Sequence, residues 1–289
     1  MKIDIKIFIQ DELKKITNKH FSKKYITQYL IPIVNNINDS IDNKFIISGP
    51  QGSGKTTLTK LLKTVIEKIY KKKVMLLSID DYYLSKKERI ELSKKVHPLL
   101  ITRGVPGTHN VKKLKRDINN FIKKKFPIRV PIFDKLIDDA SNKKKIIKKA
   151  DILLLEGWCC GSTPLTNKYL YKNINDLERQ LDNKNRWRSY YNSFLKKEYF
   201  EIFSKFEKKI YIKPSSFIHI LEWRYKQEKQ NALIKKKKNF MTKKQLEYFI
   251  QHFEKQTRWM IKTMPAEAGI VIEIDKNQKI EKVIKIDNF

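Results

Sequence analysis

The sequence has little cysteine and no apolar run long enough for a membrane-spanning helix. Its two cysteines, Cys159 and Cys160, are adjacent, which leaves neither a metal-ligand spacing nor a disulfide framework. A reducing, cytoplasmic setting is the expectation. The N-terminus lacks the apolar core of a signal peptide, so neither membrane insertion nor secretion is expected.

Acidic residues are scarce relative to basic ones, 31 against 63, which gives a formal net charge of +32. Such a charge suggests nucleic acid or an anionic membrane as a partner. However, only nine of the 63 basic residues are arginine, and lysine pairs and triplets are scattered along the whole chain. Nucleic-acid readers usually also use arginine forks. We therefore interpret the charge as a solvated surface that favours small anionic substrates, and we do not expect a nucleic-acid partner.

The most informative stretch, 44–57, contains the pattern G-x-x-x-x-G-K-T of a phosphate-binding loop. An apolar run before it predicts a buried strand, and apolar residues at helical spacing after it predict a helix. The glycines turn backbone N–H groups inward, and the helix N-terminus adds positive charge. We predict that Lys55 reaches the β- and γ-phosphates of ATP and that Thr56 holds Mg²⁺. The predicted nucleotide-binding residues are Gly49, Pro50, Gln51, Gly52, Ser53, Gly54, Lys55, Thr56 and Thr57.

Two further apolar strands are predicted to end in carboxylates. One, at 74–79, leads into Asp80 and Asp81, and another, at 152–155, leads into Glu156. Acidic side chains at the carboxyl ends of parallel strands lie where ligands bind in open α/β sheets. We expect the strand of Asp80 to lie beside the phosphate-binding loop, and therefore interpret Asp80 as the general base for an acceptor hydroxyl. Glu156 is interpreted as the residue that positions Mg²⁺ or water.

Strands alternate with helices along the chain, which predicts a three-layer α/β P-loop fold with a parallel sheet, a helical lid or insert and a C-terminal hairpin. We expect an N-terminal helical extension at 1–43 and a P-loop core at 44–164. A helical lid region with one core strand is expected at 165–262. The strands that complete the core are expected at 263–289.

Four local expectations complete this reading of the chain. The polar stretch 84–100 is expected to be a mobile connection, and the lysine run 143–149 a solvated loop or helix end. The apolar and aromatic stripe within 165–206 is interpreted as core. Apolar runs on both sides of 275–278 predict that Lys279 to Ile286 forms the second strand of a hairpin.

Several short motifs follow one another in an order that resembles the D-glycerate 3-kinase family of P-loop kinases. This family lies near uridine kinase, phosphoribulokinase and pantothenate kinase. The motifs are Gly49–Thr56, Ser78–Tyr83, Arg103–His109, Phe133–Lys135, Leu155–Trp158, and Trp223-Arg224 with Gln227-Glu228. The resemblance implies that Asp80 is the catalytic base and that Glu156 lies near Mg²⁺. It also places Arg224 in a lid helix, with Lys55 among the catalytic residues. The implied substrate-binding residues are Asp81, Tyr83, Arg103, His109, Asp134 and Lys135.

The resemblance implies an ATP-dependent small-molecule kinase that phosphorylates a hydroxyl of D-glycerate. This acceptor is anionic, and Arg103, His109 and Lys135 could hold its carboxylate. Phe133 stands where the family pattern has tyrosine, and Asn110 where it has aspartate. Other acceptors stay open for this reason: a nucleoside, a sugar phosphate or pantothenate. An alternative from a different class is a basic nucleotide switch that binds nucleic acid.

Overall fold

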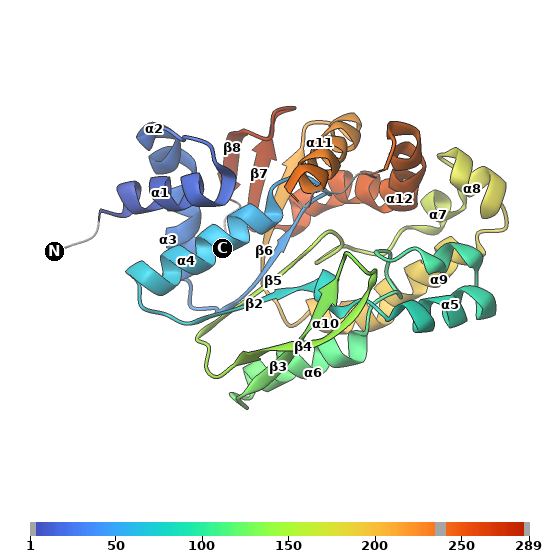
Figure 1. Cartoon of the computed structure of the whole chain (residues 1–289), viewed down its shortest axis with the longest axis horizontal. Helices are drawn as coiled ribbons and strands as arrows, with labels where there is room; N and C mark the ends of the chain where they lie inside the picture. The colour runs from blue at the N-terminus through green and yellow to red at the C-terminus, as the bar shows by residue number, and fades with distance from the viewer. Residues whose placement is uncertain (1–3, 235–240, 286–289) are drawn as a thin grey trace.

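The computed structural model describes residues 4–234 and 241–285, without the side chains of 230–234. Within these residues, six strands form one sheet in the order β2-β5-β1-β6-β7-β8 (Figure 1). Five of them run parallel, and β8 pairs antiparallel with β7. Their bounds are β1 Lys44–Ser48, β2 Val74–Ser78, β5 Ile152–Gly157, β6 Lys208–Pro214, β7 Ile270–Ile274 and β8 Ile280–Lys285. The predicted parallel sheet is confirmed.

Helices cover both faces of this sheet. The helices before the lid region are α1 Ile5–Thr17, α2 Lys23–Tyr25, α3 Ile31–Asp39, α4 Lys55–Ile69, α5 Lys86–Lys95 and α6 Val111–Ile122. Those that follow are α7 Asn167–Tyr171, α8 Asp176–Leu181, α9 Arg186–Phe194, α10 Phe200–Phe203, α11 Ile218–Ile234 and α12 Lys243–Glu267. Short π- and 3₁₀-helical turns join some of them: η1 Ile26–Leu30, η2 Ile79–Tyr82, η3 Pro98–Ile101 and η4 Leu195–Tyr199.

Side chains of the central strands alternate between two hydrophobic cores, one on each face of the sheet. Phe45 and Ile47 of β1 belong to one core, together with residues of α1, α3, α4 and α11. Ile46, which lies between them, belongs to the other core, with residues of α6, α9 and α10. Strand β5 alternates in the same way at Leu154 and Leu155. The result is the predicted three-layer α/β arrangement, with helices above and below the sheet.

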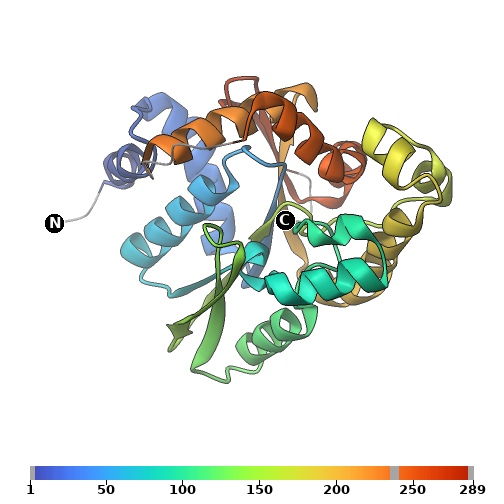
Figure 2. The ribbon, with the colours of Figure 1, turned by 45° about the vertical axis from the view of Figure 1, so that its right-hand side comes forward.

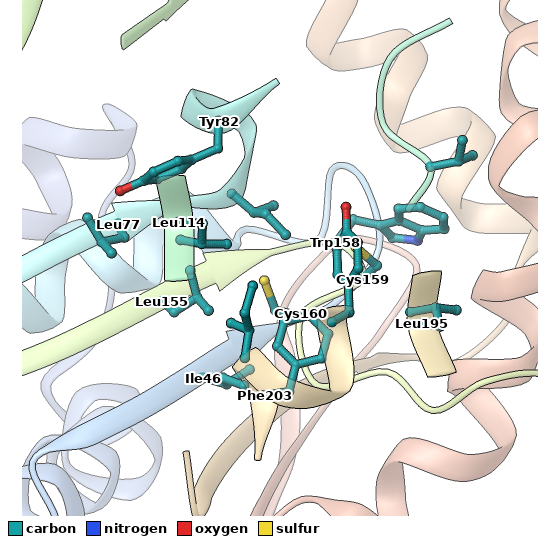
Figure 3. Close-up of a cluster of buried hydrophobic side chains, with 14 of the residues drawn as sticks. Ile46, Leu77, Tyr82, Leu114, Leu155, Trp158, Cys159, Cys160, Leu195 and Phe203 are labelled. Carbon is teal, nitrogen blue, oxygen red and sulfur yellow. The ribbon is translucent and has the colours of Figure 1, made fainter. Parts of the chain in front are cut away.

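The second core extends beneath the end of β5 (Figure 3). Trp158, Cys159 and Cys160 follow this strand and pack with Ile46 and Leu155. Both cysteines are free and buried, and burial raises the pKa of the Cys159 thiol to about 12. Such thiols behave as small apolar side chains and not as nucleophiles.

Strands β3 (Ile128–Asp134) and β4 (Asp139–Ile147) form a separate antiparallel ribbon that stands apart from the sheet (Figure 2). The expectation of a loop or helix end at 143–149 is therefore wrong, because most of this lysine run lies in β4. Most side chains of β4 are exposed, so the strand has no hydrophobic alternation to reveal it. Its backbone hydrogen bonds to β3 define it instead.

The stretch 84–100 is also ordered as helix, which corrects the expected mobile connection. Helix α5 begins with a capping box in which Ser85 and Glu88 satisfy each other's backbone N–H groups. Arg89 is 2% exposed, and its guanidinium donates to the carbonyl oxygens of Leu84, Ile101 and Asp138. These bonds fasten the helix to the residue before its N-cap, to η3 and to the loop between β3 and β4.

Two other expectations are confirmed. Most of the stripe in 165–206 is buried, including Trp187, Tyr191 and Phe206. The C-terminal hairpin forms as β7 and β8, although its expected last residue, Ile286, lies outside the described residues. None of the helices in the ranges 4–234 and 241–285 is long and apolar enough to cross a membrane.

Candidate active site

The phosphate-binding loop connects β1 to α4, as the motif predicts. The ammonium group of Lys55 donates to the carbonyl oxygen of Pro50 at 2.9 Å, within the loop itself. The side-chain oxygens of Ser48, Gln51 and Ser53 are buried and have no partner in the described part of the chain. Buried polar atoms without partners are costly. The loop therefore has unmet hydrogen-bonding capacity that a polar ligand would satisfy.

Helix α11 lies directly against this loop (Figure 1). Gly52 has φ +77°, and a Cβ atom placed on it would lie 2.7 Å from Trp223 Cβ, so only glycine fits there. Trp223 in turn donates its indole N–H to the carbonyl oxygen of Lys276 at 2.7 Å, and Gln278 donates to the carbonyl oxygen of Gly52. The next residue of α11 is Arg224, whose Nε atom is buried without a partner among the described residues, while its other guanidinium nitrogens contact Gln227 and Glu228. The contact thus places Arg224 of α11 next to the phosphate-binding loop.

Glu156 is the carboxylate at the end of the strand next to the loop. The expectation that the strand of Asp80 lies beside the loop is wrong, because β5 lies between β1 and β2. Glu156 pairs in register with Ile47 and Ser78 on either side. Burial raises the pKa of Glu156 while the charge of Lys55 opposes the rise. Burial likewise lowers the pKa of Lys55, against the charges of Glu156 and Asp80. Both carboxylates, Glu156 and Asp80, therefore favour the charged form of the same lysine, Lys55.

Asp80 lies in η2, just beyond the end of β2. Lys135 Nζ lies 2.6 Å from one carboxylate oxygen, and the Tyr83 hydroxyl donates to the other at 2.7 Å. Burial would raise the pKa of Asp80, but the charge and hydrogen bond of Lys135 and the Tyr83 hydroxyl lower it to about 2. The site therefore contains a carboxylate that is ionised at neutral pH.

Arg103 approaches the same group from the glycine-rich loop. Its guanidinium lies 5.4 Å from the centre of the Phe133 ring and 5.8 Å from that of Tyr83, and it forms an ion pair with Asp138. Asp138 also accepts a hydrogen bond from Arg89 at 2.9 Å. Neither Arg89 nor Asp138 was predicted from the sequence, because neither belongs to a motif and only the tertiary fold brings them to Arg103.

His109 is buried beside Tyr83, with the two rings stacked 4.7 Å apart. Its Nδ1 atom lies 2.6 Å from the hydroxyl of Tyr199, and its Nε2 atom has no partner among the described residues. Burial lowers the pKa of His109 to about 4. Tyr199 was not a predicted site residue. The available signal was a tyrosine in a helix interpreted as core, since a buried tyrosine hydroxyl needs a partner.

Two predicted substrate residues differ from the others. Asp81 accepts a hydrogen bond from the backbone N–H of Phe133 at 3.3 Å, and Asp134 accepts one from that of Leu136 at 2.8 Å. The first bond ties η2 to β3, and the second caps the turn that carries Lys135. The structure thus gives both carboxylates backbone partners, whereas Tyr83 and Lys135 contact Asp80 directly.

The known proteins that are similar to this chain in sequence include several kinases. No protein-family model matches the chain. The uncharacterised kinase mug58 of Schizosaccharomyces pombe is 29% identical over 234 residues, which cover 75% of this chain and 80% of that protein. The probable ATP-dependent kinase TDA10 of Saccharomyces cerevisiae is 36% identical over 132 residues, 41% of this chain and 46% of that protein.

The fold is also that of a solved kinase. A structure of D-glycerate 3-kinase from Cryptococcus neoformans superposes with a TM-score of 0.72 at 22% identity, over 96% of this chain and 99% of that one. The fold, the phosphate-binding loop and the relatives define an ATP-dependent P-loop kinase. The chain is similar in sequence to these kinases and in fold to a D-glycerate 3-kinase.

Proposed function

We propose that the protein transfers the γ-phosphoryl group of ATP to a hydroxyl group of D-glycerate. The observation that carries the proposal is the ionised carboxylate of Asp80, held between Lys135 and Tyr83. Its charge also acts on two further cations, Arg103 and Lys55, and raises the pKa of each against the opposing effect of burial. The fold that the chain shares with a D-glycerate 3-kinase supports this choice of acceptor.

The residues of the nucleotide side fit a phosphate chain with Mg²⁺. Thr56 and Glu156 would hold the ion, because a hydroxyl and a carboxylate are the hard oxygen donors that Mg²⁺ prefers. Mg²⁺ usually keeps several waters and substrate phosphates as ligands. Two protein oxygens are therefore enough, and the described ranges contain no cluster of three acidic, histidine or cysteine side chains. When bound, the ion would neutralise charge on the phosphate oxygens.

In the proposed reaction, the acceptor hydroxyl donates a hydrogen bond to Asp80 and its oxygen attacks the γ-phosphorus. The new O–P bond forms as the bond to the β-phosphate oxygen breaks, and the hydroxyl proton passes to Asp80. The transition state of phosphoryl transfer is loose, so the proton leaves late, when the hydroxyl has become acidic. A carboxylate of low pKa can then accept it. Lys55 and Arg224 stabilise the charge on the transferred group.

The acceptor side suits a small anion. Arg103 and Lys135 supply positive charge, and His109 supplies a ring nitrogen that has no partner among the described residues. Charge-assisted hydrogen bonds from such groups bind a carboxylate strongly. A reducing cytosol is the proposed setting, in which the buried thiols of Cys159 and Cys160 stay free.

The experiment measures ADP release by the purified chain with Mg²⁺ and ATP. D-glycerate is compared with uridine, pantothenate and ribulose 5-phosphate, and Lys55→Ala serves as the inactive control. Release that depends on D-glycerate and disappears in Lys55→Ala is the expected result. Release with another acceptor alone would overturn the choice of D-glycerate. ATP binding without release for any acceptor, together with salt-sensitive binding of nucleic acid, would favour a nucleotide switch instead.

A further inference from the structure

Tyr199 is buried at the acceptor site and contacts His109 through its hydroxyl group. The residue is fully buried, and His109 is 3% exposed. The hydroxyl oxygen accepts a hydrogen bond from the backbone N–H of Gly107 at 3.2 Å and lies 2.6 Å from His109 Nδ1. The contact joins η4, within the helical insert, to the glycine-rich loop that carries Arg103.

The hydrogen bonds of Tyr199 determine which nitrogen of His109 is protonated. A tyrosine hydroxyl has one hydrogen to donate, and Gly107 already supplies a hydrogen to its oxygen. Within the described ranges, His109 Nδ1 is the one acceptor that this hydroxyl meets. If Nδ1 were protonated instead, the hydroxyl hydrogen would be buried without an acceptor, which is costly. The hydroxyl therefore donates to Nδ1, and the proton of the neutral ring sits on Nε2.

The protonated nitrogen faces no acceptor among the described residues. His109 Nε2 is buried without a partner in the described part of the chain. The ring stacks on Tyr83, whose hydroxyl donates to Asp80. We propose that Tyr199 is a positioning residue that fixes His109 as its Nε2–H tautomer, so that the ring offers a neutral N–H donor to an oxygen atom of the acceptor. This inference rests on the proposed function only for the identity of that acceptor.

The proposed tautomer of His109 also contributes to the selectivity of the site for its acceptor. A neutral N–H donor binds a carboxylate or hydroxyl oxygen through its lone pair. An ammonium or amide N–H group at this position would place a second donor opposite the N–H of His109. Both donors would then lack an acceptor. His109 thus selects oxygen at this position of the acceptor.

Nitrogen NMR of the full-length protein, labelled with ¹⁵N in histidine and without substrates, tests the tautomer directly. We expect His109 to show a proton on Nε2 and an unprotonated Nδ1, with the signals assigned by their absence in His109→Gln. In Tyr199→Phe, His109 should no longer be confined to this one tautomer. Tyr211→Phe is the matched control, because Tyr211 is also fully buried but its hydroxyl has no described partner. A wild-type ring protonated on Nδ1 would overturn the proposal, even if Tyr199→Phe did not fold.

Kinetics test the consequence for the acceptor. Tyr199→Phe should raise the KM of the acceptor by about threefold to tenfold, the effect of losing one hydrogen bond, with kcat and the KM of ATP changed less. His109→Gln keeps an N–H donor and should retain more acceptor affinity than His109→Leu. An unchanged acceptor KM in Tyr199→Phe, despite a lost tautomer, would contradict the positioning role. If no tested acceptor is phosphorylated, the proposed function fails, while the NMR result still decides the tautomer.

Discussion

Asp80 is a carboxylate on which burial and ion pairing act in opposite directions. Burial opposes its ionisation, whereas Lys135 at 2.6 Å and the Tyr83 hydroxyl at 2.7 Å favour it and prevail. Lys135 is more than half exposed, so solvent screens part of its attraction. The hydrogen bond from Tyr83 is half-buried, so solvent screens it less than it screens Lys135. The pKa of the proposed proton acceptor thus depends on both an exposed lysine and a half-buried tyrosine hydroxyl.

Replacing Lys135 by methionine should therefore raise the pKa of Asp80. The protonated carboxyl group cannot accept the hydroxyl proton, so kcat should decline on acidification at a higher pH than in the wild type. A pH–rate profile of each variant measures this decline, with Lys135→Arg as the control that keeps the charge. Asp80→Asn should lower kcat by about 10²–10⁴-fold and show no such decline. Identical profiles for Lys135→Met and Lys135→Arg would contradict the role of Asp80.

The phosphate-binding loop, helix α11 and the turn between β7 and β8 meet at Gly52. The contact links the loop to α11 and to the C-terminal hairpin, which are more than 160 residues away in sequence. Gly52 and Gly54 both have positive φ, +77° and +91°. They differ in surroundings, because a Cβ at Gly52 would meet Trp223, whereas nothing lies within 4 Å of one at Gly54.

This pair gives a matched test of the contact between loop and helix. Alanine at either position costs about 1–2 kcal/mol of backbone strain. Gly52→Ala should cost about a further 1–3 kcal/mol, because the methyl group must displace Trp223. Urea unfolding without nucleotide measures both free energies of unfolding. Equal losses in the two variants would show that α11 does not pack on the loop.

At the scale of the whole molecule, burial lowers the pKa of three histidines among the described residues, His97, His109 and His252. His252 is 6% exposed among aromatic rings and donates from Nδ1 to the carbonyl oxygen of Phe249 at 3.1 Å. Burial lowers the pKa of His252 to about 4, as it does that of His109. In the unfolded chain a histidine takes its proton near its ordinary value of 6.5. Between these values the unfolded state binds more protons, so the free energy of unfolding falls as the pH falls.

His252→Phe should lessen this loss of stability. His109 and His252 each contribute at most ~1.4 kcal/mol per pH unit between about pH 6.5 and pH 4. Urea unfolding at pH 7 and pH 5 should show a smaller difference for His252→Phe than for the wild type. His20 is exposed, so His20→Gln serves as the control for removing a histidine as such. A wild-type difference that His252→Phe leaves unchanged would contradict this account.

The sequence predicted those parts of the fold that carry their own periodic signal. The strand, glycine loop and helix around Lys55 combine an apolar run, a fixed spacing and an amphipathic helix, and all three lie where expected. The carboxylates at Asp80 and Glu156 were found because each follows an apolar run. By contrast, β4 was missed because its lysines show no alternation, and α5 was missed because polar residues outweighed its capping box.

The sequence by itself determined the phosphate-binding loop, the layered α/β class and the acidic strand ends, because these depend on residues close together in the chain. Only the tertiary structure decided that β5 separates β1 from β2, so that Glu156 and not Asp80 ends the strand beside the loop. It also decided that Tyr199 meets His109 across 90 residues and that Asp138 meets Arg103. Strand order and such long-range contacts follow from the packing of whole elements, which no local pattern encodes.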